Sequence, residues 1–179
     1  MAEIEIKQAI STDINEISSL DHSCDTTHVF QLDRTIAGEQ FEVYLREVRL
    51  PRSLHLKYPR DSKDLVDQWT RYSLILVARS GERILGYLAL LEDPGFNSAR
   101  VTDLAVLPEV RRKGVATALI LAAQKWVHNR GLTRFILEVP SKNKPGVELA
   151  RKLKFDLAGY CDNYFTNLEM VLFYISVSR

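Results

Sequence analysis

The order of the helices and strands predicted for this chain indicates a mixed α/β domain, and three observations carry this prediction. The chain has 179 residues, of which 46% are hydrophobic and 26% charged, which is typical of one folded globular domain. Short stretches in which apolar and polar residues alternate indicate strands in both halves of the chain. A longer stretch at helical spacing, residues 115–128, lies between two strands of the second half. A strand, a helix and a further strand in this order indicate a right-handed crossover in a mixed sheet.

The first 70 residues contain weaker signals of both kinds. We expect a strand near residues 4–9, a helix from an N-cap at Ser11 to about residue 21, and a surface helix over residues 60–69 opened by Pro59. Residues 27–33 and 41–50 alternate apolar and polar types, and they predict either a pair of strands or a mixed cap over the sheet.

From residue 72 the strand pattern becomes stronger. A hairpin turns at Gly81, and the remaining elements follow in order: strands over residues 74–78, 84–91, 101–107 and 135–139, a helix over 145–153, and two strands within 157–177. The helix at 115–128 ends before Gly131, and its apolar residues at helical spacing are Val115, Ala118, Leu119, Ala122 and Trp126.

The balance of charges excludes several classes of partner. Lys and Arg number 24 against 23 Asp and Glu, so we expect neither nucleic acid nor an anionic membrane as a partner. Two cysteines, Cys24 and Cys161, and an N terminus unlike an export signal predict a cytoplasmic protein. Apolar runs are far below the ~20 residues that cross a bilayer, and the four histidines show no metal-ligand spacing, so we expect neither a membrane span nor a metal.

A cluster of cations stands where the strand at 101–107 gives way to the central helix. Positive charge at a helix N terminus is unfavourable, so the segment Arg111, Arg112, Lys113, Gly114 needs either solvent or an anion. Gly114 and Ala116 carry little side chain, which lets a phosphate approach the free helix-start amides. A solvated basic turn is the alternative interpretation.

This segment resembles a known signature. Arg111, Gly114 and Ala116, preceded by the strand residues Asp103, Leu104, Ala105 and Val106, resemble the acetyl-CoA signature of the GCN5-related N-acetyltransferases (GNAT). Leu137, Glu138 and Val139 followed by Asn143 resemble the second half of the same cofactor region. The resemblance covers residues 72–179, whereas the first 70 match in general pattern only; within the family, the chain is most similar to the streptothricin acetyltransferase branch.

The resemblance implies a fold and a cofactor. The fold is a single domain over residues 1–179, with a mixed, mostly antiparallel sheet, a central splayed strand pair and flanking helices. The donor is acetyl-CoA, whose pantetheine arm would bind the backbone of Leu104, Ala105 and Val106 and the side chain of Asn143. Asn143 has an equally good interpretation as a helix N-cap. The pyrophosphate would bind the backbone amides of Arg112, Lys113, Gly114, Val115, Ala116 and Thr117, and Arg111 belongs to the same cofactor-binding segment.

Acetyl transfer to an amine needs a base and a group that stabilises the oxyanion. Glu138 is the only ionisable residue in the strand at 135–139, where apolar flanks tend to raise the pKa of a carboxyl, and the resemblance assigns it the role of base. A strand-end carboxylate paired with an Arg or Lys is the alternative. The backbone N–H of Val106 is the expected oxyanion donor.

One position departs from the family pattern. Many members carry a tyrosine seven residues after the asparagine, to protonate the thiolate of CoA, and this chain has Ala150 there. Tyr164, or Tyr160 beside it, is the expected substitute, although either can be a packing residue. An unassisted thiolate or a proton from water are further alternatives.

The sequence leaves the acceptor open among a β-lysine antibiotic, a peptide N terminus, a lysine side chain and a polyamine. Acids that would attract a cationic amine are Asp25, Asp33, Glu42, Glu92, Asp93 and Asp162, each of which is also compatible with an ordinary surface role. We expect an enzyme, with a homodimer as the oligomeric state to be tested; the alternative suggested by Ala150 is a protein that binds acetyl-CoA as a sensor or scaffold without transferring the acetyl group.

Overall fold

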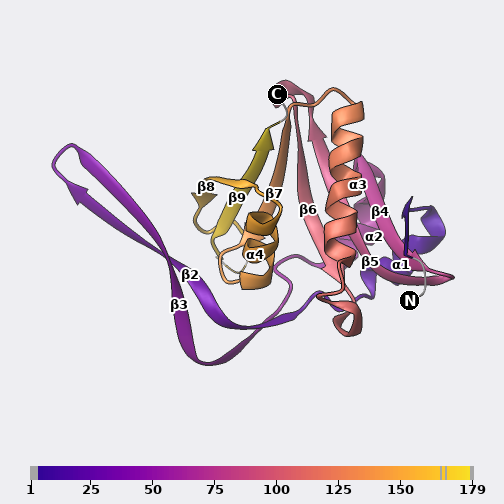
Figure 1. Ribbon diagram of the computed structural model, residues 1–179, viewed down its shortest axis with the longest axis horizontal. Coiled ribbons are helices and arrows are strands. Elements are labelled where there is room, and N and C mark those ends of the chain that lie inside the picture. Colours follow the sequence, from indigo (N-terminus) through magenta and orange to yellow (C-terminus); the bar gives the residue numbers. More distant parts are fainter. Residues whose placement is uncertain (1–3, 166, 168, 178–179) are drawn as a thin grey trace.

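A seven-stranded mixed sheet forms the centre of the molecule (Figure 1). The computed structural model describes residues 4–165, 167 and 169–177. The strands lie in the order β1 (Glu5–Gln8), β4 (Leu74–Ser80), β5 (Arg83–Asp93), β6 (Ser98–Val106), β7 (Arg134–Pro140), β9 (Val171–Val177) and β8 (Asp156–Cys161). Neighbouring strands are antiparallel except for β6 and β7, which are parallel. The predicted mixed, mostly antiparallel sheet is confirmed.

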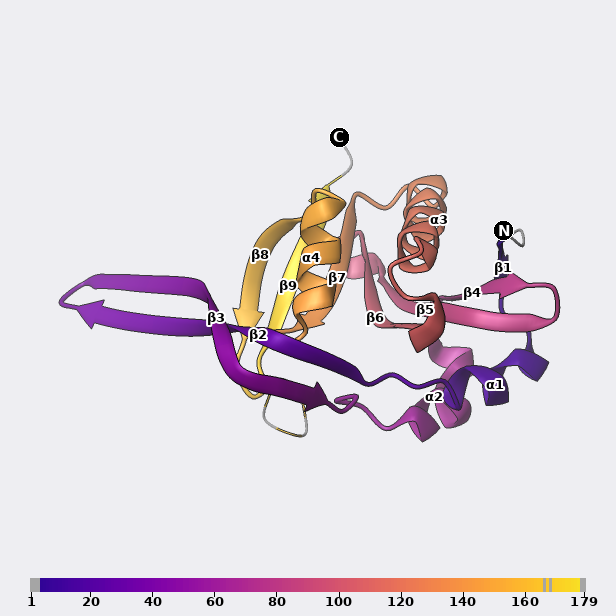
Figure 2. The same cartoon turned by 60° about the horizontal axis from the view of Figure 1, so that its bottom comes forward.

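Helices cover both faces of this sheet (Figures 1 and 2). Helices α3 (Val115–Asn129) and α4 (Lys144–Lys152) pack on one face, and α1 (Ile14–Ser18) and α2 (Ser62–Gln68) pack on the other. The two faces have separate hydrophobic clusters, because successive side chains of each strand point to opposite sides. Helix α3 connects the parallel strands β6 and β7, as the predicted crossover requires.

The buried stripe of α3 differs from the predicted one. The fully buried residues are Val115, Leu119, Ile120, Ala123 and Val127, whereas Ala118, Ala122 and Trp126 are half-buried. Val115 and Leu119 belong to both the predicted and the observed set, since both sets have helical spacing. Packing against the sheet buries the set that includes Ile120. The indole of Trp126 lies at the margin, where the Arg130 guanidinium stacks 5.3 Å from its centre.

The predicted pair of strands in the first half is a long, separate ribbon. Strands β2 (Cys24–Ala37) and β3 (Gln40–Leu56) pair antiparallel, and Figures 1 and 2 show that they project far from the sheet. Two contacts fix the base of the ribbon: the Phe30 amide donates to the Ser141 carbonyl at 3.0 Å, and Lys144 pairs with Glu47 at 2.5 Å. The alternative of a cap folded over the sheet is therefore wrong.

The helix starts in the first half also differ from the predictions. Ser11 belongs to a short 3₁₀ helix, and the residue at the N-cap of α1 is Asp13, whose carboxylate accepts from the Ile10 amide at 3.0 Å. Helix α2 begins after Asp61, whose side chain accepts from the Lys63 amide at 2.9 Å. In both places a carboxylate satisfies a free amide at the start of the segment, which the predicted Ser11, two residues before Asp13, and the predicted Pro59 do not do.

Candidate active site

Strands β6 and β7 separate in the middle of the sheet. They pair only over residues 98–101 and 134–137, although β6 continues to Val106 and β7 to Pro140. On its other side β6 stays paired with β5, up to the partners Gly86 and Val106. The backbone of β6 from Thr102 onward therefore has an edge that β7 does not cover, and an extended ligand can use its free groups. This is the splayed pair that the sequence predicted.

Gly86 keeps β5 close to β6 at the splay. A Cβ atom at this position would lie 2.6 Å from the Ala105 carbonyl oxygen and 3.1 Å from the Cα of Val106. Both obstacles are backbone atoms of β6, so a larger residue would push the strand. The absence of a side chain at Gly86 thus fixes the position of the residues predicted to hold the pantetheine arm.

Helix α3 begins beside the end of β6 with free backbone amides. Gly114 is its N-cap residue and has φ of 91°, a left-handed conformation that suits glycine. Among the described residues no side chain caps this end, and the first amide of the helix turn to find a partner is that of Ala118, which donates to the Gly114 carbonyl at 2.9 Å. The amides of Val115, Ala116 and Thr117 are therefore available to an anion at the positive end of a 15-residue helix.

The three predicted cations have different environments. Arg111 donates from Nε to the Val106 carbonyl at 2.8 Å and from a terminal nitrogen to the Asp21 carbonyl at 3.0 Å. Its guanidinium thus connects the end of β6 to the loop after α1. Arg112 and Lys113 are exposed, and Arg112 lies 3.5 Å from Glu148 of α4. Contact of this segment with a pyrophosphate stays a prediction. Arg111 also has a structural role, because it holds the end of β6 to the loop after α1.

Asn143 is the N-cap residue of α4. Its side-chain oxygen accepts from the Gly146 amide at 2.9 Å, which confirms the capping interpretation. The amide nitrogen is the remaining donor of this side chain. Contact of Asn143 with the cofactor stays a prediction.

Glu138 lies on β7 just beyond the last residue that pairs with β6, and its side chain has no exposed surface. Three groups engage its carboxylate: the Arg60 guanidinium forms a short ion pair, Arg100 lies at 3.0 Å, and the Tyr164 hydroxyl donates at 2.6 Å. The paired interpretation of this carboxylate is therefore confirmed. Its role as the base is not tested by these contacts and stays a prediction.

Tyr164 is the tyrosine that the structure brings to Glu138. Burial and the Glu138 carboxylate both raise the pKa of its hydroxyl, since it donates to an anion. Ala150, at the position where many relatives carry tyrosine, is buried in the core between α4 and the sheet. Tyr160 is half-buried and lies under the Arg34 guanidinium, 5.6 Å from the ring centre.

A second buried carboxylate, which the sequence analysis missed, lies on β6. Asp103 is 5% exposed; it accepts from the Thr102 hydroxyl at 2.6 Å and the Tyr72 hydroxyl at 3.4 Å, and its nearest cation is Arg60 at 3.9 Å. Burial, followed by the negative charge of Glu138, raises the pKa of Asp103 to about 7. The signal was present in the sequence: Asp103 is the only acid within an apolar strand, the argument that identified Glu138.

Two arginines contact these carboxylates, although no sequence pattern predicted them. Arg60 comes from the segment between the ribbon and α2, and it donates to the Thr102 carbonyl at 2.5 Å as well as to Glu138. Arg100 comes from β6. Nothing in the local sequence around either residue indicates which carboxylate it pairs with.

A hollow of about 220 Å³ opens beside Arg60. Its lining comes from the loop after α1 and the segment between the ribbon and α2: Leu20, Asp21, His22, Ser23, Lys57, Tyr58 and Arg60. The Tyr58 hydroxyl is buried and has no hydrogen-bond partner among the described residues, so a polar ligand would satisfy it. His22 stacks on Tyr58 and lies 2.9 Å from the Tyr87 hydroxyl, as expected for a satisfied histidine, and burial lowers its pKa.

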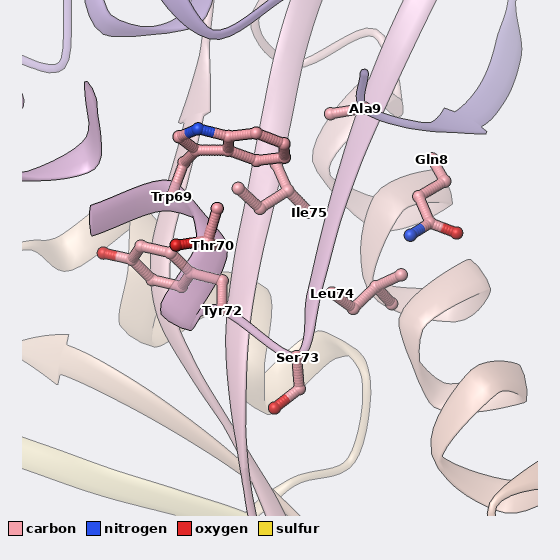
Figure 3. Close-up of a pocket in the computed structure, with 8 residues that line it drawn as sticks. All are labelled: Gln8, Ala9, Trp69, Thr70, Tyr72, Ser73, Leu74 and Ile75. Atoms are coloured by element: carbon pink, nitrogen blue, oxygen red, sulfur yellow. The ribbon is translucent and has the colours of Figure 1, made fainter. Parts of the chain in front are cut away.

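A second hollow, of about 260 Å³, lies between β1, β4 and the end of α2. Figure 3 shows the rings of Trp69 and Tyr72 at one end of it and Gln8 at the other. No residue predicted for the site lines it, so we place the reaction at the splay instead. In the described part of the chain, no group of three or more His, Cys, Asp or Glu side chains is arranged to hold a metal. Nor does any described helix combine the length and apolar character needed to cross a bilayer.

The acids proposed to attract the acceptor are mostly engaged elsewhere. Five have a side-chain partner: Asp25 with His55, Asp33 with Arg46, Glu42 with Tyr44, Glu92 with Arg130, and Asp162 with Arg34. Asp93 ends β5 and is exposed. These pairs lie along the ribbon and at strand ends, whereas Glu138 and Asp103 are the acids at the splay.

Comparison with known proteins matches this geometry. Residues 41–155 match the model of the acetyltransferase (GNAT) family. The streptothricin acetyltransferase of Streptomyces lavendulae is 28% identical over 160 residues, which cover 87% of this chain and 82% of that protein. The crystal structure of nourseothricin acetyltransferase superposes with a TM-score of 0.83 and 26% identity over the whole of both chains.

A second solved structure shares the fold. It is a putative streptothricin acetyltransferase from Bacillus anthracis in complex with acetyl coenzyme A, with a TM-score of 0.75 and 19% identity over 98% of this chain and all of that one. The family match confirms the predicted fold and acetyl transfer to an amine as the class of activity. The chain therefore belongs to the GNAT family of acetyltransferases, as its sequence predicted.

Proposed function

We propose that this enzyme transfers the acetyl group of acetyl-CoA to the β-lysine amine of a streptothricin-like antibiotic, by direct attack in a ternary complex. The observation that carries the reaction is the opening between β6 and β7, which has the free amides of α3 at one end and the buried anion Glu138 beside it. The choice of acceptor is supported by the similarity to streptothricin and nourseothricin acetyltransferases, which extends over the ribbon as well as the sheet.

The residues of the splay fit the donor. Bound acetyl-CoA supplies an activated thioester. The uncovered edge of β6 at Leu104, Ala105 and Val106 offers backbone groups to the pantetheine arm, and the amides that begin α3 offer donors to the pyrophosphate. The Val106 N–H is the proposed oxyanion donor, since it lies at the end of the uncovered edge.

The acceptor approaches on the other face, that of α1 and α2. The hollow beside Arg60 is lined by the loop after α1 and the segment after β3, which includes Tyr58, whose buried hydroxyl has no partner among the described residues. Neither Glu138 nor Asp103 lines this hollow, but both contact Arg60, which does. An amine that enters beside Arg60 would therefore reach the two carboxyl groups.

The proton transfers of this reaction are predictions. Glu138 as base and Tyr164 as proton donor to the thiolate come from the family resemblance and the position of Tyr164. The 2.6 Å hydrogen bond between them supports their place at the reaction centre without distinguishing their roles.

A sensor or scaffold that binds acetyl-CoA without transferring the acetyl group is the second candidate. It is favoured by Ala150, which is buried and removes the usual proton donor. Tyr164 beside Glu138 favours the enzyme.

We further propose a single domain that works in the cytoplasm as a homodimer. Two free cysteines support a reducing compartment. The ribbon supports self-association, because Ile36 and Phe41 pair near its tip with exposed fractions of 76% and 58%.

Release of the CoA thiol over a panel of amines tests the proposal. Streptothricin, free lysine, spermidine and a short peptide with a free N terminus represent the four acceptor classes. We expect turnover to be fastest with streptothricin, with one acetyl group added by mass spectrometry. Binding of acetyl-CoA with no turnover on any amine would favour the sensor, and faster turnover of the peptide would contradict the proposed acceptor.

A further inference from the structure

We infer that Asp103 is the group that takes the proton from the acceptor amine, and that Glu138 is a positioning residue that stays ionised and holds Arg60 and Arg100 in place. This inference rests on the proposed function, and it replaces Glu138 by Asp103 as the base of that reaction. It is argued from the different surroundings of two buried carboxylates at one splay.

Glu138 is poorly placed to take a proton. Two guanidinium groups and one phenol engage its two oxygens, so its lone pairs are committed to donors. Protonation would remove the counter-charge of two arginines in a buried place, which is costly. Such a carboxylate fixes its neighbours and remains an anion.

Asp103 is in the opposite situation. Its two closest partners, Thr102 and Tyr72, are neutral hydroxyls, and the Arg60 guanidinium stays 3.9 Å away because it is bonded to Glu138 and to the Thr102 carbonyl. Asp103 therefore lacks a close cation, and it lies on β6 two residues before Ala105, within the part of the strand that β7 leaves uncovered. A carboxylate here can exchange a proton without breaking an ion pair.

The charged and titratable groups that face Asp103 come from several elements. Arg60 faces it from the segment before α2, Tyr72 from the start of β4, and Glu138 from β7. Behind these lie Asp64 of α2 and Tyr87 of β5 next to Tyr72, and Arg100 and Tyr164 next to Glu138. Burial is the largest influence, Glu138 adds to it, and the pKa of Asp103 rises to about 7, where a base is half ionised at neutral pH.

Arg60 marks the route by which an amine reaches Asp103. Its side chain is 25% exposed, lines the hollow, and places a cation where Glu138, Asp103 and the Thr102 carbonyl converge. The same three acceptors suit an ammonium group, which is the other cation of similar charge and hydrogen-bonding capacity. The acceptor amine thus enters beside this guanidinium.

The step balances as follows. The ammonium group loses one proton to the ionised Asp103, and the neutral amine attacks the thioester carbonyl. The C–N bond forms and the C–S bond breaks, with its electron pair going to sulfur. The second proton of the nitrogen goes to the sulfur and gives the CoA thiol, and Asp103 releases its proton to solvent.

The decisive experiment is the pH profile of kcat/KM for streptothricin in the wild type, Asp103→Asn and Glu138→Gln. In the wild type we expect activity to rise with a midpoint near the pKa of Asp103, about 7, because the base must be ionised. In Asp103→Asn we expect a fall of about 100- to 10,000-fold and the loss of this rise, with binding of acetyl-CoA unchanged. In Glu138→Gln the rise should persist at a lower midpoint, since one negative charge beside Asp103 is gone.

A graded variant keeps the test valid if Asp103→Asn fails to fold. Thr102→Val removes the hydroxyl that donates to Asp103 at 2.6 Å. Loss of this donor disfavours the carboxylate, so the midpoint should rise by about one pH unit. A purely structural role of Thr102 would lower activity at every pH and leave the midpoint in place.

Two results would overturn the inference, and they are distinguishable. An unchanged pH profile in Asp103→Asn, or loss of the rise in Glu138→Gln alone, assigns the base to Glu138 and leaves the proposed function standing. Absence of turnover by the wild type on every amine overturns the proposed function itself, and the base with it. Glu5→Gln, which changes an exposed acid on the edge strand β1, is the matched control and should keep the wild-type profile.

Discussion

The two strands that separate at the centre of the sheet, β6 and β7, each carry one buried acid, but their surroundings differ sharply. Asp103 on β6 has neutral hydroxyls as its nearest partners, and its cation is 3.9 Å away. Glu138 on β7 is held by two guanidinium groups and a phenol. One arginine, Arg60, contacts both and is bonded to Glu138.

This difference shows how one site separates two chemically similar groups. Two guanidinium groups and a phenol hold Glu138, whereas burial and a neighbouring anion raise the pKa of Asp103. Pairs of carboxylates separated in this way commonly divide the acid and base roles of a reaction. The free energy of unfolding can be measured without substrate, and it tests the same difference between Asp103 and Glu138.

The largest effect is expected from Glu138→Gln. The variant leaves Arg60 and Arg100 without their shared counter-charge, and we expect a loss of about 3 kcal/mol in the free energy of unfolding. This lies at the low end of the usual range because the two arginine side chains are 25% and 40% exposed. Urea denaturation at neutral pH measures it.

Glu109→Gln is the matched control for that loss. Glu109 pairs with Arg83, but both side chains are more than half exposed, so water screens the pair. We expect no measurable change in stability. Equal losses in the two variants would mean that Glu138 is no more than an ordinary surface ion pair.

The next effect concerns the pH dependence of stability. The pKa of Asp103 is raised from 3.8 to about 7, so between these values the folded state binds a proton that the unfolded state has lost, and stability falls as pH rises. Between about pH 5 and about pH 8 this cost is about 2–3 kcal/mol.

Asp103→Asn removes the titrating group and therefore this part of the fall. Urea denaturation of wild type and variant at the two pH values gives the difference directly, because other titrating groups cancel. A difference that does not change with pH would mean that Asp103 titrates as it does in the unfolded chain.

The smallest effects come from the two tyrosines. Tyr164→Phe removes a 2.6 Å hydrogen bond to an ionised carboxylate, and we expect a loss of about 1–2 kcal/mol. Tyr72→Phe removes a 3.4 Å contact to Asp103, and we expect less than about 0.5 kcal/mol. Thermal or urea denaturation compares the two variants. A larger loss for Tyr72→Phe would contradict the proposal that Glu138 is held more firmly by its partners than Asp103.

Local patterns were enough to predict the cofactor half of the fold. The apolar run in β5, the alternation in β7, the helical spacing in α3 and the turn at Gly114 each act within a few residues, so sequence alone resolves them. The same holds for Asn143, which was given both as a cap and as a ligand. Asp103 was equally visible as a lone acid in an apolar strand, so the sequence already contained the signal for a second buried carboxylate.

Long-range contacts were beyond prediction from one sequence. Arg60 reaches Glu138 across 78 positions, and no periodicity encodes such a pairing. The ribbon also exceeded its predicted length, because its outer residues pair without a core whose burial pattern would reveal them. The position of α3 on the sheet selected Ile120 over Ala118 and Trp126, a choice that packing makes and helical spacing leaves open.

The most direct measurement is a ¹³C NMR titration of the side-chain carboxyls, with Asp103 assigned by the resonance that Asp103→Asn removes. A midpoint for Asp103 near its raised pKa of about 7 is the predicted result. A midpoint near 4, the ordinary value for an aspartate, would contradict the account, because Asp103 would then be too weak a base for the proposed proton transfer.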